Sequence, residues 1–110
     1  MPKPMPAAKK RAVRGSRTGR PIMALLDLLG QRWTLRVVWE LRGARLTFRA
    51  LQEACGGMSP TVLNGRLKAL RESGLIDAEG GGYGLTAMGR EFLDVFMPVV
   101  EWSKRWARRA

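Results

Sequence analysis

The chain has 110 residues, enough for one hydrophobic core, and its 45% of hydrophobic residues is ordinary for a globular protein. Twenty basic residues against nine acidic ones give a net charge of +11, which points to a polyanionic partner such as nucleic acid or an anionic membrane surface. One cysteine excludes an internal disulfide, and the lack of histidine argues against a metal site, so no metal or cofactor is expected.

The charge is unevenly distributed along the chain. Residues 1–20 hold seven of the basic residues and none of the acidic ones, and they are rich in proline, alanine and glycine. Such a segment buries too little apolar surface to offset its ordering entropy. We therefore expect a disordered basic arm at residues 1–20 and a folded domain at residues 21–110. The arm is either a solvated tail or a source of additional phosphate contacts.

Other features exclude membrane insertion and catalysis. No run approaches the roughly 18 apolar residues of a membrane span. The basic N-terminal segment also lacks the apolar run of a signal peptide, so we expect a cytoplasmic protein with no membrane partner. An enzyme is not expected, because there is no histidine, no activated cysteine, no phosphate loop and no plausible carboxylate pair.

The first two predicted elements are helices. Pro21 suits the first turn of a helix that Gly30 ends. The second helix runs from about Arg32 to Arg42. It is too apolar to have one buried face only, so we expect it to lie centrally and to pack on two sides. The apolar residues are Ile22, Leu25, Leu26, Leu28 and Leu29 in the first helix, and Trp33, Leu35, Val37, Val38, Trp39 and Leu41 in the second.

Two capped helices follow a short extended link at residues 46–48. Thr47 is a good N-cap for a third helix from Phe48 to about Cys55. Residues 56–58 form a tight turn, and Ser59 caps a fourth helix that begins with Pro60 and runs to residue 73, with Gly74 as its stop. The apolar stripe of this fourth helix consists of Leu63, Leu67 and Leu70.

A hairpin and a last helix complete the predicted order. Residues 75–79 and 83–85 are predicted to be strands around a turn of three glycines. Thr86 caps a helix from Ala87 to about Trp106, and Pro98 inside it should kink or split it. The apolar face of this helix contains Phe92, Leu93, Phe96, Val99, Val100 and Trp102.

Residues 47–86 therefore have the order of a winged helix-turn-helix: a helix, a tight turn, a second capped helix and a hairpin. The predicted fold class is mainly α with a small β-hairpin. Turning the leucine stripe of the fourth helix inward points Thr61, Gly65, Lys68 and Glu72 outward, with Asn64 on the flank, where a recognition helix meets the major groove. The candidates for base edges are Ser59, Thr61, Asn64 and Gly65, and those for phosphates are Arg49, Arg66 and Lys68.

Both of these assignments have plainer alternatives. The outward residues of the fourth helix are also what any solvated helix face presents. The predicted wing has no Lys or Arg at its tip. It can touch phosphates through backbone N–H groups, for which Gly81 is the candidate, or it is a plain hairpin.

The chain also resembles a known family. Residues 24–106 look like the HxlR-type winged-helix regulators of bacteria, with matching residues in the same order. These are Leu28-Leu29-Gly30-Gln31-Arg32-Trp33-Thr34-Leu35, Phe48-Arg49-Ala50-Leu51, Met58-Ser59-Pro60-Thr61-Val62-Leu63, Arg66-Leu67, Leu70, Ser73-Gly74-Leu75-Ile76, Tyr83-Gly84-Leu85-Thr86-Ala87-Met88-Gly89, Trp102 and Trp106.

The resemblance implies a transcription regulator that binds double-stranded DNA as a homodimer. The first and last helices would form the interface between the two subunits. The apolar residues of these helices support a dimer independently, because they exceed what so small a chain easily buries. The alternative is that they all belong to the monomer core. The candidate interface residues are Leu25, Leu26, Leu29, Phe92, Phe96, Val99, Trp102 and Trp106.

The chain departs from the family in two places. Redox-sensing members carry a reactive cysteine before the first helix, whereas Cys55 lies late in the third helix, where a free cysteine is usually a buried apolar residue. The wing is also shorter and less basic. No residue pattern indicates a small-molecule effector. The competing functions are a winged-helix module for non-specific nucleic-acid binding or for protein binding.

Overall fold

The computed structural model describes residues 19–109 of the chain. Residues 1–18 and residue 110 lie outside the described part, and with them nearly all of the expected basic arm. None of the helices among the described residues is long and apolar enough to cross a membrane.

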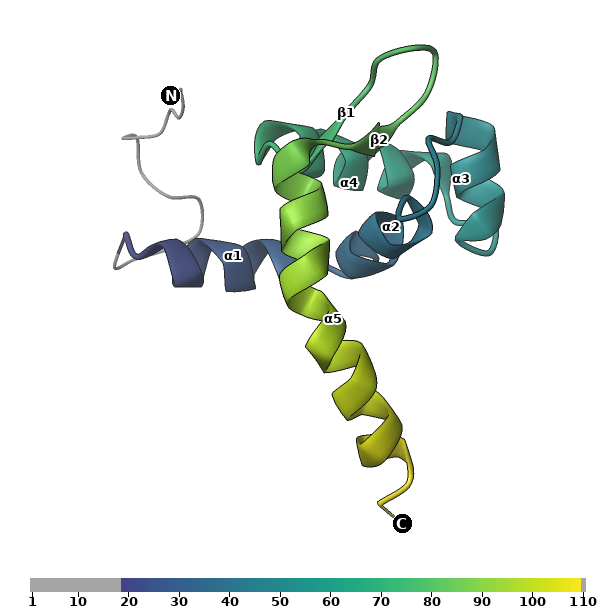
Figure 1. The fold of residues 1–110 in the computed structure, drawn as a ribbon. Coiled ribbons are helices and arrows are strands. Elements are labelled where there is room, and N and C mark those ends of the chain that lie inside the picture. The colour runs from purple at the N-terminus through teal and green to yellow at the C-terminus, as the bar shows by residue number, and fades with distance from the viewer. Residues whose placement is uncertain (1–18, 110) are drawn as a thin grey trace. The chain divides into compact units, whose positions relative to one another are not determined.

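The described chain contains five helices and one two-stranded hairpin (Figure 1). Contacts divide it into two compact units, one up to Thr34 and one from Leu35 onward. The elements are α1 (Pro21–Leu29), α2 (Thr34–Glu40), α3 (Phe48–Ala54), α4 (Pro60–Glu72), β1 (Ile76–Asp77), β2 (Gly84–Leu85) and α5 (Ala87–Ala107).

The first unit consists of α1 and the turn that follows it. Arg20 precedes the helix and Pro21 occupies its first turn, where a missing N–H costs nothing. The helix ends where the N–H of Gly30 donates to the carbonyl oxygen of Leu26 at 2.8 Å. Trp33 then has a left-handed backbone with φ of 81°, which is strained for a large side chain.

The core of the second unit lies between α2, α3 and α4. The larger side chains that are fully buried here are Val37, Val38, Leu41, Leu51, Cys55, Leu63 and Leu70. Val37 and Val38 of α2 and Leu41 just after it are buried on one face of the helix, while Leu35 and Trp39 on an adjoining side are half-buried and line a groove with α5.

The hairpin pairs β1 with β2 in antiparallel register, with Ile76 opposite Leu85 and Asp77 opposite Gly84. The link before α3 adds a third segment, because Leu46 and Tyr83 form an isolated bridge with N···O distances of 2.7 and 2.9 Å. The loop of the hairpin extends beyond the helices of this unit (Figure 1). Helix-turn-helix and hairpin together confirm the predicted fold class.

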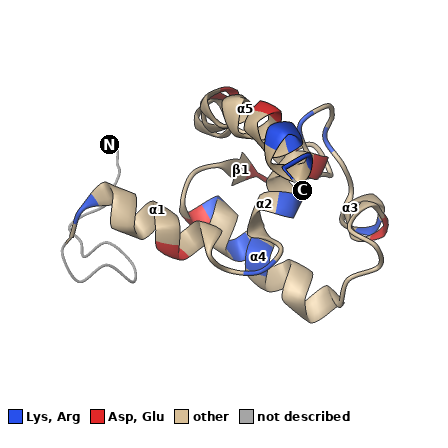
Figure 2. Ribbon diagram, turned by 90° about the horizontal axis from the view of Figure 1, so that it is seen from below, with Lys and Arg blue, Asp and Glu red and all other residues tan. Residues whose placement is uncertain are grey.

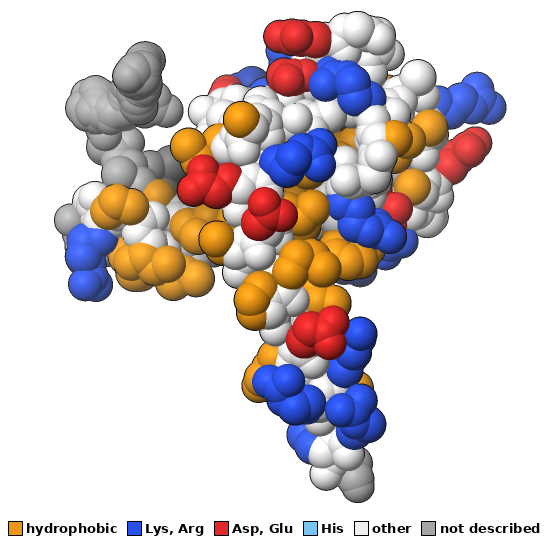
Figure 3. Space-filling view, in the orientation of Figure 1, with side chains coloured by type: hydrophobic (Ala, Val, Ile, Leu, Met, Phe, Trp, Pro, Cys, Tyr) orange, Lys and Arg blue, Asp and Glu red, His pale blue; other side chains and the backbone are white. Residues whose placement is uncertain are grey.

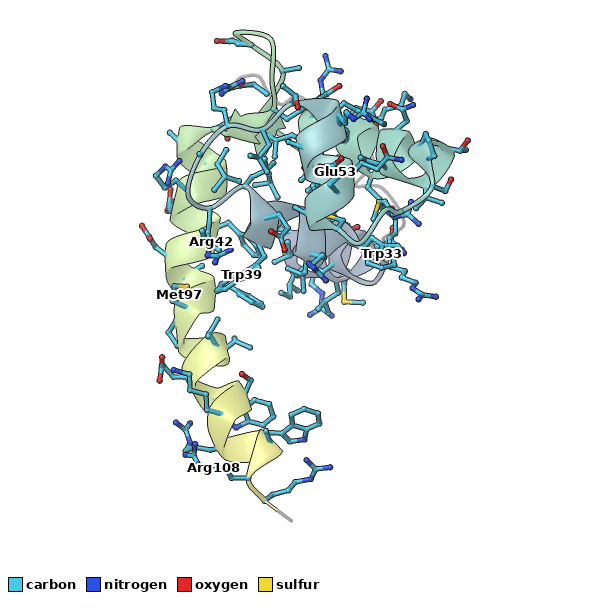
Figure 4. The ribbon with its side chains drawn as sticks, turned by 90° about the vertical axis from the view of Figure 1, so that its right-hand side faces the viewer. Trp33, Trp39, Arg42, Glu53, Met97 and Arg108 are labelled. Carbon is cyan, nitrogen blue, oxygen red and sulfur yellow. The ribbon has the colours of Figure 1, made fainter. Side chains whose placement is uncertain are left out.

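The last helix, α5, runs without interruption through Pro98, so the proline does not split it. Its axis bends near Met97, in agreement with a proline kink (Figure 4). The N-terminal half packs closely: a Cβ on Gly89 would come within 2.0 Å of the carbonyl oxygen of Leu75. Only the last turns of α5 extend away from α2–α4 (Figure 1).

The predicted element boundaries differ from the observed ones by one or two residues in most cases. The second helix begins at Thr34 rather than Arg32 and ends at Glu40, and each strand is shorter than predicted. The hairpin pairs over two residues only, because three consecutive glycines widen the loop between its strands.

Candidate nucleic-acid interface

The helix-turn-helix is held by caps at both helices. The hydroxyl of Thr47 accepts from the N–H of Ala50 at 3.1 Å, and that of Ser59 accepts from the N–H of Val62 at 3.3 Å. Each cap satisfies a backbone donor that the first helical turn leaves without a partner. Both N-caps lie where the sequence predicted them.

The turn between α3 and α4 is fixed by backbone conformation and by one side chain. Gly56 and Gly57 have φ values of 78° and 74°, in the left-handed region that favours glycine. The side-chain amide of Gln52 donates to the carbonyl oxygen of Met58 at 2.9 Å across the turn. The angle at which α4 leaves α3 is therefore set by local contacts.

Arg36 ties α2 to the end of α3. One guanidinium nitrogen donates to the carbonyl oxygen of Ala54 at 2.9 Å, and another pairs with the carboxylate of Glu40 at 2.8 Å. The last carbonyls of a helix lack intrahelical donors, so a cation there is favourable. The sequence analysis did not single out Arg36.

The two faces of α4 differ as its residue spacing predicts. Leu63, Leu67 and Leu70 are buried, together with Ala69. The opposite face exposes Thr61, Asn64, Gly65 and Lys68, while Arg66 is half-buried. Ser59 is exposed at the N-terminal end of the same helix. The predicted base-edge candidates therefore lie together at one end of one helix face.

On each of α3 and α4, one basic side chain pairs with an acidic one. Arg49 lies 3.8 Å from Glu53 and Lys68 lies 3.0 Å from Glu72, in both cases one helical turn apart and exposed. Figure 2 shows basic and acidic positions on both helices. Exposed pairs of this kind contribute about 0–1 kcal/mol, so Arg49 and Lys68 can exchange their carboxylates for phosphates at little cost.

The wing carries no basic residue, but a basic residue from elsewhere lies against it. Gly80 and Gly81 at its tip are exposed and have φ values of 65° and 77°. Arg45, in the link between α2 and α3, donates to the carboxylate of Asp77 at 2.6 Å and to the carbonyl oxygen of Glu79 at 2.6 Å. Sequence reasoning missed Arg45, because a lone arginine in a loop forms no pattern.

The side chains of α5 form two apolar stripes with different surroundings. Leu93 is buried, and Phe96, Val99 and Val100 line a groove against Leu35 and Trp39 of α2. The guanidinium of Arg42 lies 4.1 Å from the centre of the Trp39 ring, and both side chains lie beside α5 (Figure 4). The second stripe, which shares Val99 with the first, repeats at spacings of four and three and is mostly exposed. Its members are Met88, Phe92, Val95, Val99, Trp102 and Trp106.

The exposed stripe is extensive for a single chain. Val95 is 67% exposed, and Trp102 and Trp106 are each 51% exposed while stacking on one another with ring centroids 6.2 Å apart. In α1, Leu26 is exposed and Leu25 and Leu29 are half-buried. Figure 3 shows hydrophobic side chains over α1 and over much of α5, with Lys and Arg gathered at the end of α5.

Cys55 is 1% exposed at the end of α3. Burial raises the pKa of its thiol, although the nearby charge of Arg36 acts in the opposite direction. Reactive cysteines have depressed pKa values and are accessible, so Cys55 fits the buried apolar role. Within residues 19–109, no group of three or more metal-ligating side chains could hold a metal ion.

Comparison with known proteins agrees with this geometry. The model of the HxlR-like helix-turn-helix family matches residues 28–110, which include the helix-turn-helix, the wing and α5. The chain belongs to the HxlR-like helix-turn-helix family. It is accordingly an HTH-type transcriptional regulator, a class that binds DNA and is not enzymatic.

Similar proteins of known sequence are HTH-type transcriptional regulators. One from Methanocaldococcus jannaschii is 27% identical over 88 residues, which cover 76% of this chain and 83% of that protein. Another from Synechocystis is 33% identical over 94 residues, which cover 78% of this chain and 69% of its relative.

Several solved structures have the same fold, with TM-scores above 0.7. The quinone-bound YodB of B. subtilis has a TM-score of 0.72 and 25% identity, and the match covers 76% of this chain and 96% of YodB. A possible HxlR family transcriptional factor from Thermoplasma volcanium has a TM-score of 0.71 and 28% identity, with 82% and 87% of the two chains covered.

Proposed function

We propose that this regulator recognises a two-fold symmetric operator as a homodimer, with α4 reading base pairs in the major groove. The observation that carries the proposal is the division of α4 into a buried leucine face and an exposed face of small polar residues. Small side chains at the start of a recognition helix allow the backbone to approach the bases closely.

The residues divide by chemistry into base readers and phosphate anchors. Asn64 is the main base reader, since its amide can donate to and accept from one adenine. Ser59 and Thr61 offer hydroxyls, and Gly65 permits close approach. Arg49, Arg66 and Lys68 hold phosphates, as does the backbone N–H of Gly81 in the wing, and the basic residues within 1–20 add charge that favours DNA of any sequence.

The dimer is proposed to form through the exposed stripe of α5. Residues at spacings of four and three keep one seam facing a partner helix, as in a two-stranded coiled coil. Val99, Trp102 and Trp106 would bury most of their exposed area in this seam. Phe92 belongs to the same stripe, Phe96 supports it from the groove against α2, and Leu25, Leu26 and Leu29 of α1 are proposed as a separate part of the dimer interface.

The quinone in the YodB structure does not carry over to this chain. The only cysteine, Cys55, is buried, and burial raises its thiol pKa. We propose that the chain does not sense electrophiles through a thiol. Labelling of the native protein with a thiol reagent would contradict this if Cys55 reacted as fast as free cysteine.

Selection of DNA from a random-sequence pool tests the function directly. The purified protein should enrich one palindromic motif with half-sites roughly 10 base pairs apart, and footprinting should show two protected half-sites. Sedimentation of the free protein should give the mass of a dimer. Uniform binding to every duplex, steeply weakened by salt and without a protected site, would instead favour the non-specific module.

A further inference from the structure

Arg45 makes a cluster of short polar contacts with the wing from outside the hairpin. A single guanidinium nitrogen of Arg45 lies 2.6 Å from Asp77 Oδ1, 2.6 Å from the carbonyl oxygen of Glu79 and 2.9 Å from that of Gly82. These acceptors are on both sides of the hairpin loop. Arg45 therefore closes the base of the loop from outside the hairpin.

The neighbouring backbone is built around this side chain. Gly84 faces Arg45 so closely that a Cβ there would come within 2.5 Å of Nη1 and 2.8 Å of Cγ. A Cβ on Gly82 would come within 3.0 Å of the carbonyl oxygen of Leu46. Leu46, next to Arg45, forms the backbone bridge to Tyr83. The two glycines leave the space that the link and the arginine occupy.

The charges make the contact relevant to DNA. Residues 76–85 contain two acidic side chains, Asp77 and Glu79, and no basic one. A wing of this composition would be repelled by phosphates. Arg45 neutralises the charge of Asp77 at the base of the hairpin loop. The exposed glycines at the tip are then the part of the wing that can approach a phosphate, through their backbone N–H groups.

We propose that Arg45 is the positioning residue of the wing, which it holds in the conformation that contacts the DNA backbone beside the major groove read by α4. The inference rests on the proposed operator binding. It explains how a wing without a basic tip can contribute to affinity. The contribution is geometric: the Nη2 contacts of Arg45 fix the loop, and the loop contacts the phosphate.

Three variants and one matched control separate geometry from charge. Arg45→Gln removes the guanidinium contacts and one positive charge, whereas Arg42→Gln removes the same charge from an arginine that contacts Trp39 instead of the wing. The double variant Arg45→Gln with Asp77→Asn has the net charge of the wild type but lacks the contact. Gly84→Ala keeps every charge and displaces the arginine by contact with the added methyl group.

Two footprints of a duplex selected by the wild-type protein are the principal measurements: hydroxyl-radical cleavage, which reports the sugar-phosphate backbone, and dimethyl sulfate methylation, which reports guanine N7 in the major groove. Arg45→Gln should lose the protection that flanks each half-site, keep guanine protection in the major groove, and lose about tenfold in affinity. The double variant and Gly84→Ala should lose the same flanking protection. Arg42→Gln should retain it. Amide hydrogen exchange at Gly80–Tyr83 of the free protein should quicken in every variant that loses the contact.

The opposite results would overturn the inference. Wild-type flanking protection in Arg45→Gln, or its recovery in the charge-matched double variant, would mean that the contacts of Arg45 do not position the wing. Equal loss of flanking and major-groove protection would mean that Arg45 only stabilises the fold. If the wild type selects no site, the proposed function fails separately. The amide exchange rates of the variants, together with their affinities for a random-sequence duplex, then still test whether Arg45 positions the wing.

Discussion

The hydroxyl of Thr86 donates a 2.6 Å hydrogen bond to the carbonyl oxygen of Gly74, which joins the exit of α4 to the entry of α5. The hydroxyl oxygen of Thr86 also accepts from the N–H of Gly89 at 3.0 Å and so caps α5. The N–H of Thr86 donates to the carbonyl oxygen of Leu75 at 3.0 Å. One residue therefore links the reading helix to the proposed dimer helix.

Replacement of Thr86 by valine should destabilise the fold by about 2 kcal/mol, because it removes a helix cap and leaves the Gly74 carbonyl without its donor. Valine keeps the shape of the side chain, so the change isolates the hydroxyl. Urea unfolding measures the effect. Thr86→Ser retains the hydroxyl and should cost less than half as much; equal losses in both variants would mean that the methyl group matters instead.

Two glycines in helices should respond to alanine in opposite directions. At Gly89 the new Cβ would lie 2.0 Å from the Leu75 carbonyl oxygen, so Gly89→Ala must push α5 away from the hairpin and should cost about 3 kcal/mol. At Gly65 nothing lies within 4 Å, so Gly65→Ala should raise stability by about 0.5–1 kcal/mol. Thermal unfolding of both variants checks the pair, and a stable Gly89→Ala protein would contradict the close packing.

The helices and caps could be predicted because their signals are local. Thr47, Ser59 and Thr86 stand directly before apolar periodic segments, and all three accept the expected backbone N–H. The leucine spacing of α4 likewise determined which of its faces is buried.

Contacts between distant segments could not be predicted from these patterns. Arg45 and Asp77 are 32 residues apart, and neither belongs to a periodic set. The role of Gly89 also depends on a carbonyl group from a different element. The division of α5 into a stripe facing α2 and an exposed stripe required the position of α2, since both stripes are apolar and lie side by side.

Asn64 should determine base preference at one position of each half-site. Asn64→Ala should cost about 1–3 kcal/mol on the preferred duplex and much less on duplexes changed at that base pair, because a bidentate amide contact is lost only where it was made. Lys68→Ala is the control: as a phosphate anchor it should weaken all duplexes alike and reduce the salt slope by about one. Equal losses on all duplexes for Asn64→Ala would make Asn64 a phosphate contact.

The Arg45–Asp77 pair should give stability a specific pH dependence. The hydrogen bond from Arg45 holds the pKa of the Asp77 carboxyl below its usual range. A group with a depressed pKa in the folded state stabilises it at neutral pH, and this contribution is lost as the pH falls through that pKa. The difference in unfolding free energy between wild type and Asp77→Asn should therefore persist at pH 5–7 and shrink below about pH 4. A difference that did not change with pH would mean that the charge of Asp77 contributes nothing.

The exposed stripe of α5 should control the oligomeric state. Trp102→Ser combined with Trp106→Ser removes two stacked rings that are each half exposed in the single chain. If these rings fill the dimer seam, sedimentation should show a monomer whose helix content is that of the wild type. Aromatic residues in such seams dominate the association energy. The loss should exceed about 4 kcal/mol, which raises the dissociation constant by about a thousandfold.

Met97→Gln is the matched control for that change, because Met97 lies on the same helix, is 39% exposed and is outside the stripe of spacings four and three. It should remain dimeric at every concentration at which the wild type does. Operator binding should depend on the dimer, because a monomer contacts one half-site only and so gains roughly half of the contact free energy. The double tryptophan variant should therefore lose two-site footprints and keep weak binding. A double variant that still sediments as a dimer would place the interface on α1 or elsewhere.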